Sequence, residues 1–257
     1  MSTNRFRGQV AVVTGATGGL GQVLVQSLAE QGADIVLTGR SEPACQQLAQ
    51  RVRDLGVRAI ALAGDLRDPQ HCEALIQAAV DELGGVDLLF NNAGTIPRGT
   101  IQQTSDKMWD TAIDLNLGAA FRLSRAAINH MAQHGGGAIV NVSSVWGVYP
   151  GPGHLAYCTA KGAVAAMTKA LGRDHAPQNI RVNAVCPNEV DTPMLREGFV
   201  QRGLDPASAI EQLDDSVPLG HVASPQEIVD VMLFLASDEA RYMAGATVEV
   251  TGAKPVY

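Results

Sequence analysis

Short, continuous apolar runs alternate along this chain with longer stretches of helical periodicity. The strand-like runs are Val10–Val13, Ile35–Leu37, Ala59–Leu62, Val86–Phe90, Ile139–Val142, Val182–Val185 and Thr247–Val250. The helix-like stretches lie near 19–31, 42–55, 69–83, 105–133, 155–176 and 224–236. Strands that are apolar on both faces are typical of parallel sheets covered by helices on each side. The alternation therefore predicts an α/β fold, a doubly wound parallel β-sheet of about seven strands flanked by helices on both faces.

The least regular part of the chain is 188–222. A long insertion of this kind in a compact α/β fold favours a lid or binding segment over a passive loop. Its apolar residues and the glycines at 198 and 203 predict a short amphipathic helix that closes over the bound ligands. The alternative is a rigid surface helix that packs permanently on the core. No linker, repeat or low-complexity segment interrupts the chain, so we expect 1–257 to form a single domain.

Composition narrows the possible partners. Nineteen Lys and Arg stand against 26 Asp and Glu, a net charge of −7, which argues against nucleic acid or an anionic membrane as the main partner. The chain begins without an apolar secretion segment, so a cytoplasmic protein is expected. Its four cysteines, at 45, 72, 158 and 186, are scattered, and we expect buried reduced thiols and no metal site.

A glycine-rich turn follows the first strand and precedes a helix. It has the spacing T-G-x-x-x-G-x-G, which differs from the common G-x-G-x-x-G. Such a turn lets backbone N–H groups approach a pyrophosphate at a helix N-terminus, although an ordinary glycine turn remains the alternative. The predicted contacts are Gly15, Thr17, Gly19, Leu20 and Gly21.

Further cofactor contacts are predicted at the ends of the next strands. The second strand leads to Arg40, where an acidic residue would select NAD(H), and Arg40 can instead pair with the 2′-phosphate of NADP(H). NADP(H) is therefore favoured, with NAD(H) or a merely exposed arginine as the alternatives. Asp65 could cap the adenine edge. The other predicted contacts are Leu66 after the third strand and Asn92, Ala93 and Gly94 after the fourth.

Tyr157 and Lys161 stand four residues apart in a helical stretch, and therefore share one face of the helix. An ammonium group close to a phenol favours the phenolate and lowers the pKa of the tyrosine, which could then act as a general base or acid near neutral pH. Ser144 precedes Tyr157 by thirteen residues, and Asn116 lies in the preceding helical stretch. A Y-x-x-x-K pair alone is a chance-level match, because a surface tyrosine and a solvated lysine would give the same pattern.

The joint order and spacing of the glycine turn, Asn91-Asn92-Ala93-Gly94, Asn116, Ser144, Tyr157 and Lys161 resembles the short-chain dehydrogenase/reductase family over nearly the whole chain. The resemblance implies a Rossmann-type fold, a nicotinamide cofactor and hydride transfer between an alcohol and a carbonyl. It also implies that Ser144 holds the substrate oxygen, that Lys161 holds the nicotinamide ribose, and that Asn116 anchors a water linking Lys161 to solvent. Pro187, Val190 and Thr192 occupy positions expected to contact the cofactor.

Two segments depart from the family pattern. Asn188 stands where the family usually has glycine after proline, and Val250-Thr251-Gly252-Ala253-Lys254 replaces the usual Asp-Gly-Gly near the C-terminus. The change at Asn188 concerns the turn that meets the nicotinamide. The change near the C-terminus concerns how that end of the chain packs, and not the chemistry.

The resemblance implies a ring of substrate-facing residues around Ser144 and Tyr157, namely Arg98, Trp146, His154, Asn188 and Glu189. These groups favour a small polar alcohol or ketone such as a sugar, sugar acid or polyol, although several could instead point to solvent. A 3-oxoacyl-thioester reductase is the alternative activity. A non-catalytic nicotinamide-binding regulator is the alternative of another class. The resemblance also implies that the outer faces of the helices 105–133 and 155–176 pair across a two-fold axis, and that a second contact near the C-terminus completes a homotetramer.

Overall fold

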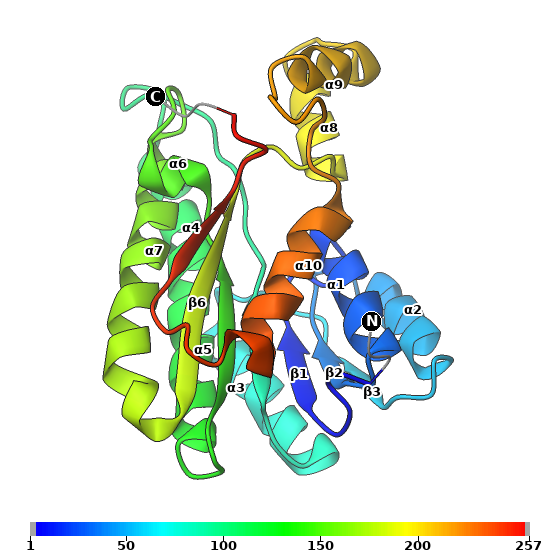
Figure 1. Cartoon of the computed structure of the whole chain (residues 1–257). Helices are drawn as coiled ribbons and strands as arrows, with labels where there is room; N and C mark the ends of the chain where they lie inside the picture. Colours follow the sequence, from blue (N-terminus) through cyan, green and yellow to red (C-terminus); the bar gives the residue numbers. More distant parts are fainter. Residues whose placement is uncertain (1–3, 255–257) are drawn as a thin grey trace.

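Seven parallel strands form one sheet in the order β3-β2-β1-β4-β5-β6-β7 (Figure 1). The computed structural model describes residues 4–254 of the chain. The strands are β1 (Val10–Val13), β2 (Asp34–Leu37), β3 (Ala59–Ala61), β4 (Leu88–Asn91), β5 (Gly137–Val142), β6 (Ile180–Pro187) and β7 (Thr247–Val250). Each predicted strand run is present with small changes at its ends. The doubly wound, Rossmann-type α/β fold is therefore confirmed.

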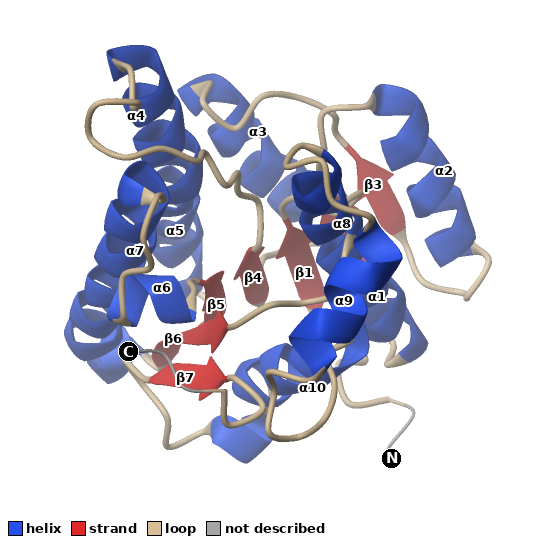
Figure 2. Ribbon diagram, turned by 90° about the horizontal axis from the view of Figure 1, so that it is seen from above, coloured by secondary structure: helices blue, strands red, loops and turns tan. Residues whose placement is uncertain are grey.

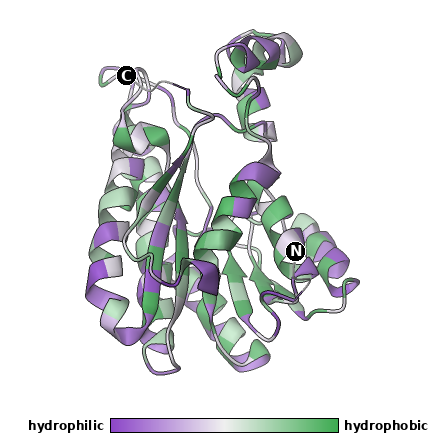
Figure 3. Cartoon of the chain, in the orientation of Figure 1, coloured by the Kyte–Doolittle hydropathy of each residue, from purple (hydrophilic) through white to green (hydrophobic). Residues whose placement is uncertain are grey.

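Helices cover both faces of the sheet (Figure 2). The helices of the described residues are α1 (Gly19–Glu30), α2 (Glu42–Arg53), α3 (Pro69–Ala78), α4 (Asp106–Ile113), α5 (Ala119–Met131), α6 (Val145–Val148), α7 (Leu155–His175), α8 (Pro193–Val200), α9 (Pro206–Asp214) and α10 (Pro225–Ala236). One apolar cluster joins the sheet to α1, α2 and α10, and a second joins it to α3 and α5. Colouring by hydropathy shows that the strands are mostly apolar, while the helices around them mix apolar and polar residues (Figure 3). Burial on both faces explains why the strands read as continuous apolar runs.

The start of α10 is a capping box. The Glu227 carboxylate accepts a hydrogen bond from the Ser224 backbone N–H at 2.7 Å, and the Ser224 hydroxyl accepts one from the Glu227 N–H at 3.4 Å. This capping box, with Pro225 at the first helical position, satisfies backbone donors that have no partner within the helix.

Two predicted helices are interrupted by π-helical turns. The stretch 105–133 divides into α4, a π turn at Asp114–Gly118 and α5, and the stretch 69–83 ends in a π turn at Ala79–Leu83. A π turn adds one residue to a helical turn without needing a proline or glycine inside it. The 3.6-residue periodicity of the flanking helices is preserved on either side, so the pattern alone could not reveal the insertion.

The segment 188–222 contains two helices, which corrects the prediction of one. Thr192 caps α8 and Asp205 caps α9, and a proline follows each cap at the first helical position. Gly203, with φ of 73°, lies in the turn between them. Both helices stand above the carboxyl ends of the strands (Figure 1). Over residues 4–254, no helix combines the length and the apolar character needed to cross a bilayer.

Candidate active site

The glycine turn after β1 lies against the turn after β4, where the strand order reverses. The Thr14 hydroxyl accepts hydrogen bonds from the backbone N–H groups of Asn92 and Ala93, at 3.0 and 3.1 Å. The Asn92 side chain donates to the carbonyls of Thr14 and Gly15, at 2.9 and 3.2 Å. These bonds hold together the two turns that flank the switch point, which is the usual ligand site of an open α/β sheet.

The glycines of this turn are required by close backbone contacts. Gly15 has φ of 62°, and a Cβ atom there would lie 2.9 Å from the Cα of Ala93. A Cβ on Gly21 would collide with the Gly15 carbonyl, and one on Gly19 would lie 3.0 Å from the Thr192 side chain. The turn therefore opens α1 with its backbone N–H groups accessible, a cradle that fits a dinucleotide pyrophosphate. Leu20 and Thr17, also predicted contacts, lie on the same turn and are partly exposed.

Near the predicted adenosine contacts lies Arg67, a charged residue that the sequence analysis did not single out. Asp65 pairs with Arg67, whose Nε lies 3.0 Å from both carboxylate oxygens. Hydrogen bonding from Arg67 lowers the pKa of Asp65 to about 2, and the charge of Arg40 contributes in the same direction. Arg40 is exposed and Leu66 is buried. Asp65 thus has a side-chain partner of its own, and its contact with adenine stays a prediction.

Ser144, Tyr157 and Lys161 are brought together at the carboxyl end of β5. All three are buried, with exposed fractions of 6%, 8% and 4%. The Lys161 Nζ lies 5.9 Å from the centre of the Tyr157 ring and donates a 2.6 Å hydrogen bond to the Val142 carbonyl. The Ser143 hydroxyl donates to the Lys161 carbonyl at 2.8 Å, which ties the end of β5 to α7.

The protonation of this pair corrects one expectation. Burial raises the pKa of Tyr157 to about 12, and hydrogen bonding with the Ser144 side chain opposes this only in part. Burial likewise lowers the pKa of Lys161 to about 8. We expected the ammonium of Lys161 to lower the pKa of Tyr157, but in the chain by itself the loss of water around both groups outweighs their attraction.

Asn116 lies in the π turn between α4 and α5. Its side-chain oxygen accepts a hydrogen bond from the Thr95 N–H at 2.9 Å, and its side-chain nitrogen donates to the Thr95 carbonyl at 3.0 Å. A Cβ on Gly94 would lie 2.7 Å from the Asn116 oxygen and 3.5 Å from the Lys161 Nζ. Both polar atoms of the Asn116 side chain therefore hydrogen-bond to the loop after β4. The role of Asn116 in anchoring a water therefore stays a prediction.

One wall of the site is built from two segments that the sequence places far apart. Gly99 donates a backbone hydrogen bond to the Gly153 carbonyl at 2.7 Å, and Leu155 donates one to the Gly99 carbonyl at 3.3 Å. This bridge sets the loop that carries Arg98 beside the start of α7. His154 then packs on Trp146 with ring centres 4.3 Å apart, and Trp146 meets Tyr157 edge-on at 6.4 Å. Three of the predicted substrate-facing residues therefore lie together.

The two segments that depart from the family pattern contact each other, and Asn188 and Glu189 line a small hollow with Val250, Thr251 and Gly252. The Lys254 Nζ lies 3.1 Å from Oε1 of Glu189, with both side chains largely buried. The backbone N–H of Asn188 donates to the Val250 carbonyl at 3.1 Å, which extends the pairing of β6 with β7. Buried atoms without a hydrogen-bond partner remain on Asn188 (Nδ2) and Glu189 (Oε2). Pro187 is buried and Thr192 caps α8, while Val190 bridges to Ala223.

A model of the short chain dehydrogenase family matches residues 9–202, which include the glycine turn, Asn116, Ser144, Tyr157, Lys161 and α8. The chain belongs to the short-chain dehydrogenase family. A 3-oxoacyl-[acyl-carrier-protein] reductase of Vibrio cholerae is 36% identical over 247 residues, which are 96% of this chain and 97% of the relative.

Two solved structures are similar over nearly the full length. The L-sorbose reductase of Gluconobacter frateurii, in complex with NADPH and L-sorbose, superposes with a TM-score of 0.92 at 32% identity and covers 99% of this chain and 98% of its own. A variant of the actinorhodin polyketide ketoreductase with NADPH superposes with a TM-score of 0.91 at 31% identity, covering 97% and 98%. This short-chain dehydrogenase is accordingly an oxidoreductase.

Three features of the site were missed by sequence reasoning. The Arg67 pair with Asp65 lies only two residues away in the chain and could have been found. Lys254 was noted only as part of an atypical C-terminus. A buried chain of hydrogen bonds runs from Ser124 on α5 through Asn91 on β4 and Asn141 on β5 to Thr168 on α7. It crosses two strands and two helices, so no local pattern predicts it.

Proposed function

We propose that this short-chain dehydrogenase transfers a hydride between NADP(H) and a small polar substrate that carries a ketone or a secondary alcohol, such as a sugar, sugar acid or polyol. The observation that carries the proposal is the burial of Ser144, Tyr157 and Lys161 side by side, beneath a wall formed by Arg98, Trp146 and His154. A small polar substrate would find hydrogen-bonding groups on that wall and an apolar indole beside them.

The protein's residues would manage the substrate oxygen and its proton. Ser144 would hold the oxygen, and Tyr157, protonated at neutral pH, would give its proton to the oxygen of a ketone. In the reverse direction Tyr157 would accept the proton of an alcohol. The bound nicotinamide supplies or accepts the hydride. Lys161 would hold the nicotinamide ribose, and a cationic Lys161 would offset negative charge developing on the tyrosine oxygen.

The proposed preference for NADP(H) rests on Arg40 and on the two similar solved structures. Arg40 is exposed near the end of β2, close enough to Asp65 to affect the pKa of that carboxyl group, and its planar fork matches a phosphate. Both solved neighbours described above contain NADPH. NADP(H) is therefore proposed, with NAD(H) as the alternative.

A 3-oxoacyl-thioester reductase is the second candidate, favoured by the similarity to the Vibrio cholerae enzyme. The partly buried Arg98 places a positive charge close to His154, which suits a polar substrate better than an acyl chain. A non-catalytic regulator would bind the dinucleotide through the glycine turn alone. It would have no need for the buried tyrosine and lysine.

A substrate screen tests the proposal. Ketoses, oxo sugar acids, polyols and a 3-oxoacyl thioester would be offered with NADPH or NADP⁺, and with NADH or NAD⁺, while the absorbance of the reduced nicotinamide is followed. Turnover of a sugar, sugar acid or polyol at a kcat/KM above that of the thioester supports the proposal. A clear preference for the thioester would replace it with the second candidate. Cofactor binding without turnover of any compound would favour the regulator.

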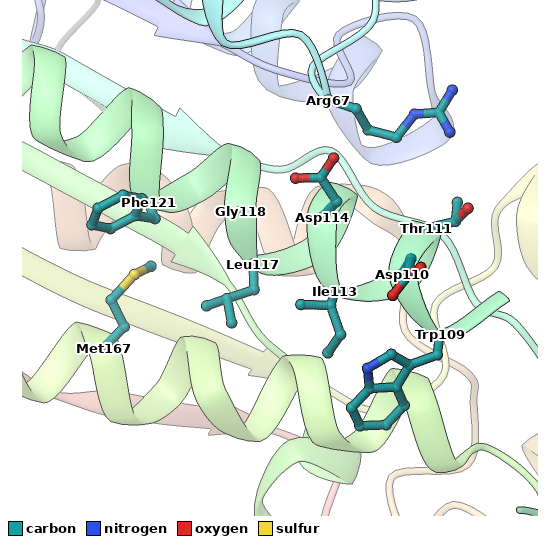
Figure 4. A pocket seen from close by; sticks show the side chains of 10 residues that line it. All are labelled: Arg67, Trp109, Asp110, Thr111, Ile113, Asp114, Leu117, Gly118, Phe121 and Met167. Atoms are coloured by element: carbon teal, nitrogen blue, oxygen red, sulfur yellow. The ribbon is translucent and has the colours of Figure 1, made fainter. Parts of the chain in front are cut away.

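We also propose that the chain forms a homotetramer in which the outer faces of α4, α5 and α7 make one contact across a two-fold axis, and a region near the C-terminus makes the second. A groove of about 590 Å³ runs over these helices, with Trp109, Phe121 and Met167 in its lining. Figure 4 shows its apolar side chains directed into the space between α7 and the α4–α5 pair, with Asp114 and Arg67 on the side of that pair away from α7. Trp109 and Phe121 are 37% and 49% exposed, so a second copy of the chain could bury them. This groove lies away from Tyr157 and is not the catalytic site.

A further inference from the structure

Two arginines from separate segments meet on the last turn of α8. Arg98 comes from the loop after β4, and its Nη1 donates to Oε1 of Gln201 at 3.4 Å. Its guanidinium packs so closely on Gly198 that any larger side chain there would collide with it. Arg202 folds back over the same turn, where its Nε donates to the Gly198 carbonyl at 3.1 Å and its guanidinium lies over the Phe199 ring at 4.8 Å. The absence of a side chain at Gly198 therefore allows both cations to approach one turn of helix.

Neither arginine is neutralised by a carboxylate. Over residues 4–254, the ion pairs within 4.0 Å involve other cations, and Glu197, the acidic residue next to Gly198 on α8, is in none of them. Burial lowers the pKa of Arg98, and the charge of Arg202 lowers it further. Arg98 is partly buried and Arg202 is exposed, and holding two like charges close together costs free energy that an anion between them would recover.

This arginine pair lies on the wall of the catalytic site. The backbone bridge between Gly99 and residues 153–155 sets Arg98 beside His154, and stacking then connects His154 through Trp146 to Tyr157. Burial lowers the pKa of His154, and the charges of Arg98 and Arg202 act in the same direction. His154 is thus kept neutral near pH 7, so the positive charge of this wall belongs to the two arginines.

We propose that Arg98 and Arg202 together form an anion site, and that the natural substrate carries a carboxylate or phosphate in addition to its ketone or alcohol. This inference rests on the proposed function and narrows its substrate class to sugar acids, sugar phosphates and similar anions. Guanidinium forks match both oxyanions in shape and in hydrogen-bond donors. Because Arg202 follows α8 while Arg98 belongs to the body of the protein, a bound anion would also tie the α8 segment to the catalytic wall.

Binding measurements with the NADPH-loaded enzyme test the anion site without requiring turnover. Titration calorimetry would compare gluconate, glucitol 6-phosphate and neutral glucitol, which share a six-carbon chain. We expect the better anion to bind about 10- to 100-fold more tightly than glucitol, the range of one or two charge-assisted hydrogen bonds. Arg98→Met and Arg202→Met should each abolish most of this advantage, and the corresponding lysine variants should retain part of it.

Two control variants separate charge from structure. Gln201→Ala removes the hydrogen bond that holds Arg98 to α8 but keeps both charges, so the preference for anions should persist. Arg173→Met removes an arginine from the far end of α7, about 24 Å along the helix from Tyr157, and should change nothing. Equal binding of all three probes, or a preference for anions that survives in both methionine variants, would overturn the proposal.

The result is distinguishable from failure of the proposed function. If the enzyme turns over neutral ketones, and adding a carboxylate or phosphate to the ketone gives no gain in kcat/KM, the activity stands and the anion site is wrong. If anions bind through the arginines but no carbonyl compound is turned over, the anion site stands and the proposed activity is wrong. Selective binding of gluconate or of the phosphate identifies which oxyanion the site prefers.

Discussion

At the scale of single residues, the protonation of Tyr157 and Lys161 is set by burial. With the pKa of Tyr157 raised to about 12 and that of Lys161 lowered to about 8, the chain by itself favours the neutral form of each group more than free amino acids do. A protonated phenol suits donation to a ketone. Oxidation of an alcohol requires the phenolate, which needs added positive charge nearby. The oxidised nicotinamide is a cation and would supply it.

A tyrosine titration tests this account. The difference in phenolate absorbance between the native enzyme and Tyr157→Phe isolates Tyr157 from the other tyrosines. A raised pKa means that the proton is retained as pH increases, so no signal from Tyr157 is expected up to about pH 10, the ordinary pKa of tyrosine. Saturating NADP⁺ should shift the signal to lower pH. A midpoint below about pH 9 without NADP⁺ would mean that the ammonium of Lys161, and not burial, governs the tyrosine.

Arg40 is the single residue on which the predicted preference for NADP(H) over NAD(H) depends. Arg40→Asp replaces a cation with a carboxylate beside Asp65, so it should repel a 2′-phosphate and accept hydrogen bonds from a ribose 2′-hydroxyl. We expect the ratio of kcat/KM for NADPH to that for NADH to fall by at least about 10-fold, the scale of one lost charge-assisted hydrogen bond. Arg51→Asp, on the exposed face of α2, is the matched control. A native enzyme that already prefers NADH would refute the role of Arg40.

At the scale of elements, the sequence predicted the strands and helices that have a regular apolar pattern, and it missed the features that have none. The apolar runs predicted all seven strands. Before α8 and α9, the pairs Thr192-Pro193 and Asp205-Pro206 are recognisable N-cap sequences, and the prediction of one helix overlooked them. The π turn at Asp114–Gly118 could not be foreseen, because an inserted residue leaves the flanking periodicity intact. Tyr157 and Lys161 were placed correctly on one face of α7, yet their pKa values depend on burial by distant segments, which the four-residue spacing does not encode.

The segment containing α8 and α9 is proposed as a lid that substrate orders. Thr192, which caps α8, lies against Gly19 of the phosphate turn, and Arg98 packs on Gly198, so the segment contacts both ends of the proposed site. Exposed apolar residues on it, including Met194, Val200 and Leu204, leave room for closure to bury more surface.

Amide hydrogen exchange on the free, NADPH-bound and ternary forms tests the lid. We expect protection of residues 191–215 to rise stepwise as each ligand is added, while that of the central strand β4 stays constant as an internal reference. Strong and equal protection of 191–215 in all three forms would show that the segment is a fixed part of the scaffold.

At the scale of the whole molecule, assembly would bury the groove over α4, α5 and α7. Phe121→Glu places a charge on the most exposed aromatic ring of that groove and should dissociate the tetramer into dimers, because an unpaired charge at an apolar contact is costly to desolvate. Sedimentation velocity at micromolar concentration would report the change, with Phe234→Glu on α10 as a control at a similarly exposed phenylalanine away from the groove. A native protein that sediments as a monomer would contradict the proposed assembly.

The central claim is that Tyr157 supplies the proton for hydride transfer between a nicotinamide and a carbonyl. Tyr157→Phe keeps the ring that packs edge-on against Trp146 and removes only the hydroxyl. With the best substrate from the screen at saturation, kcat should fall by at least about 100-fold, the lower scale of acid–base catalysis, while the Kd for NADPH measured on the same preparation stays unchanged. A Phe variant that binds NADPH normally and turns over at a near-native rate would contradict the account.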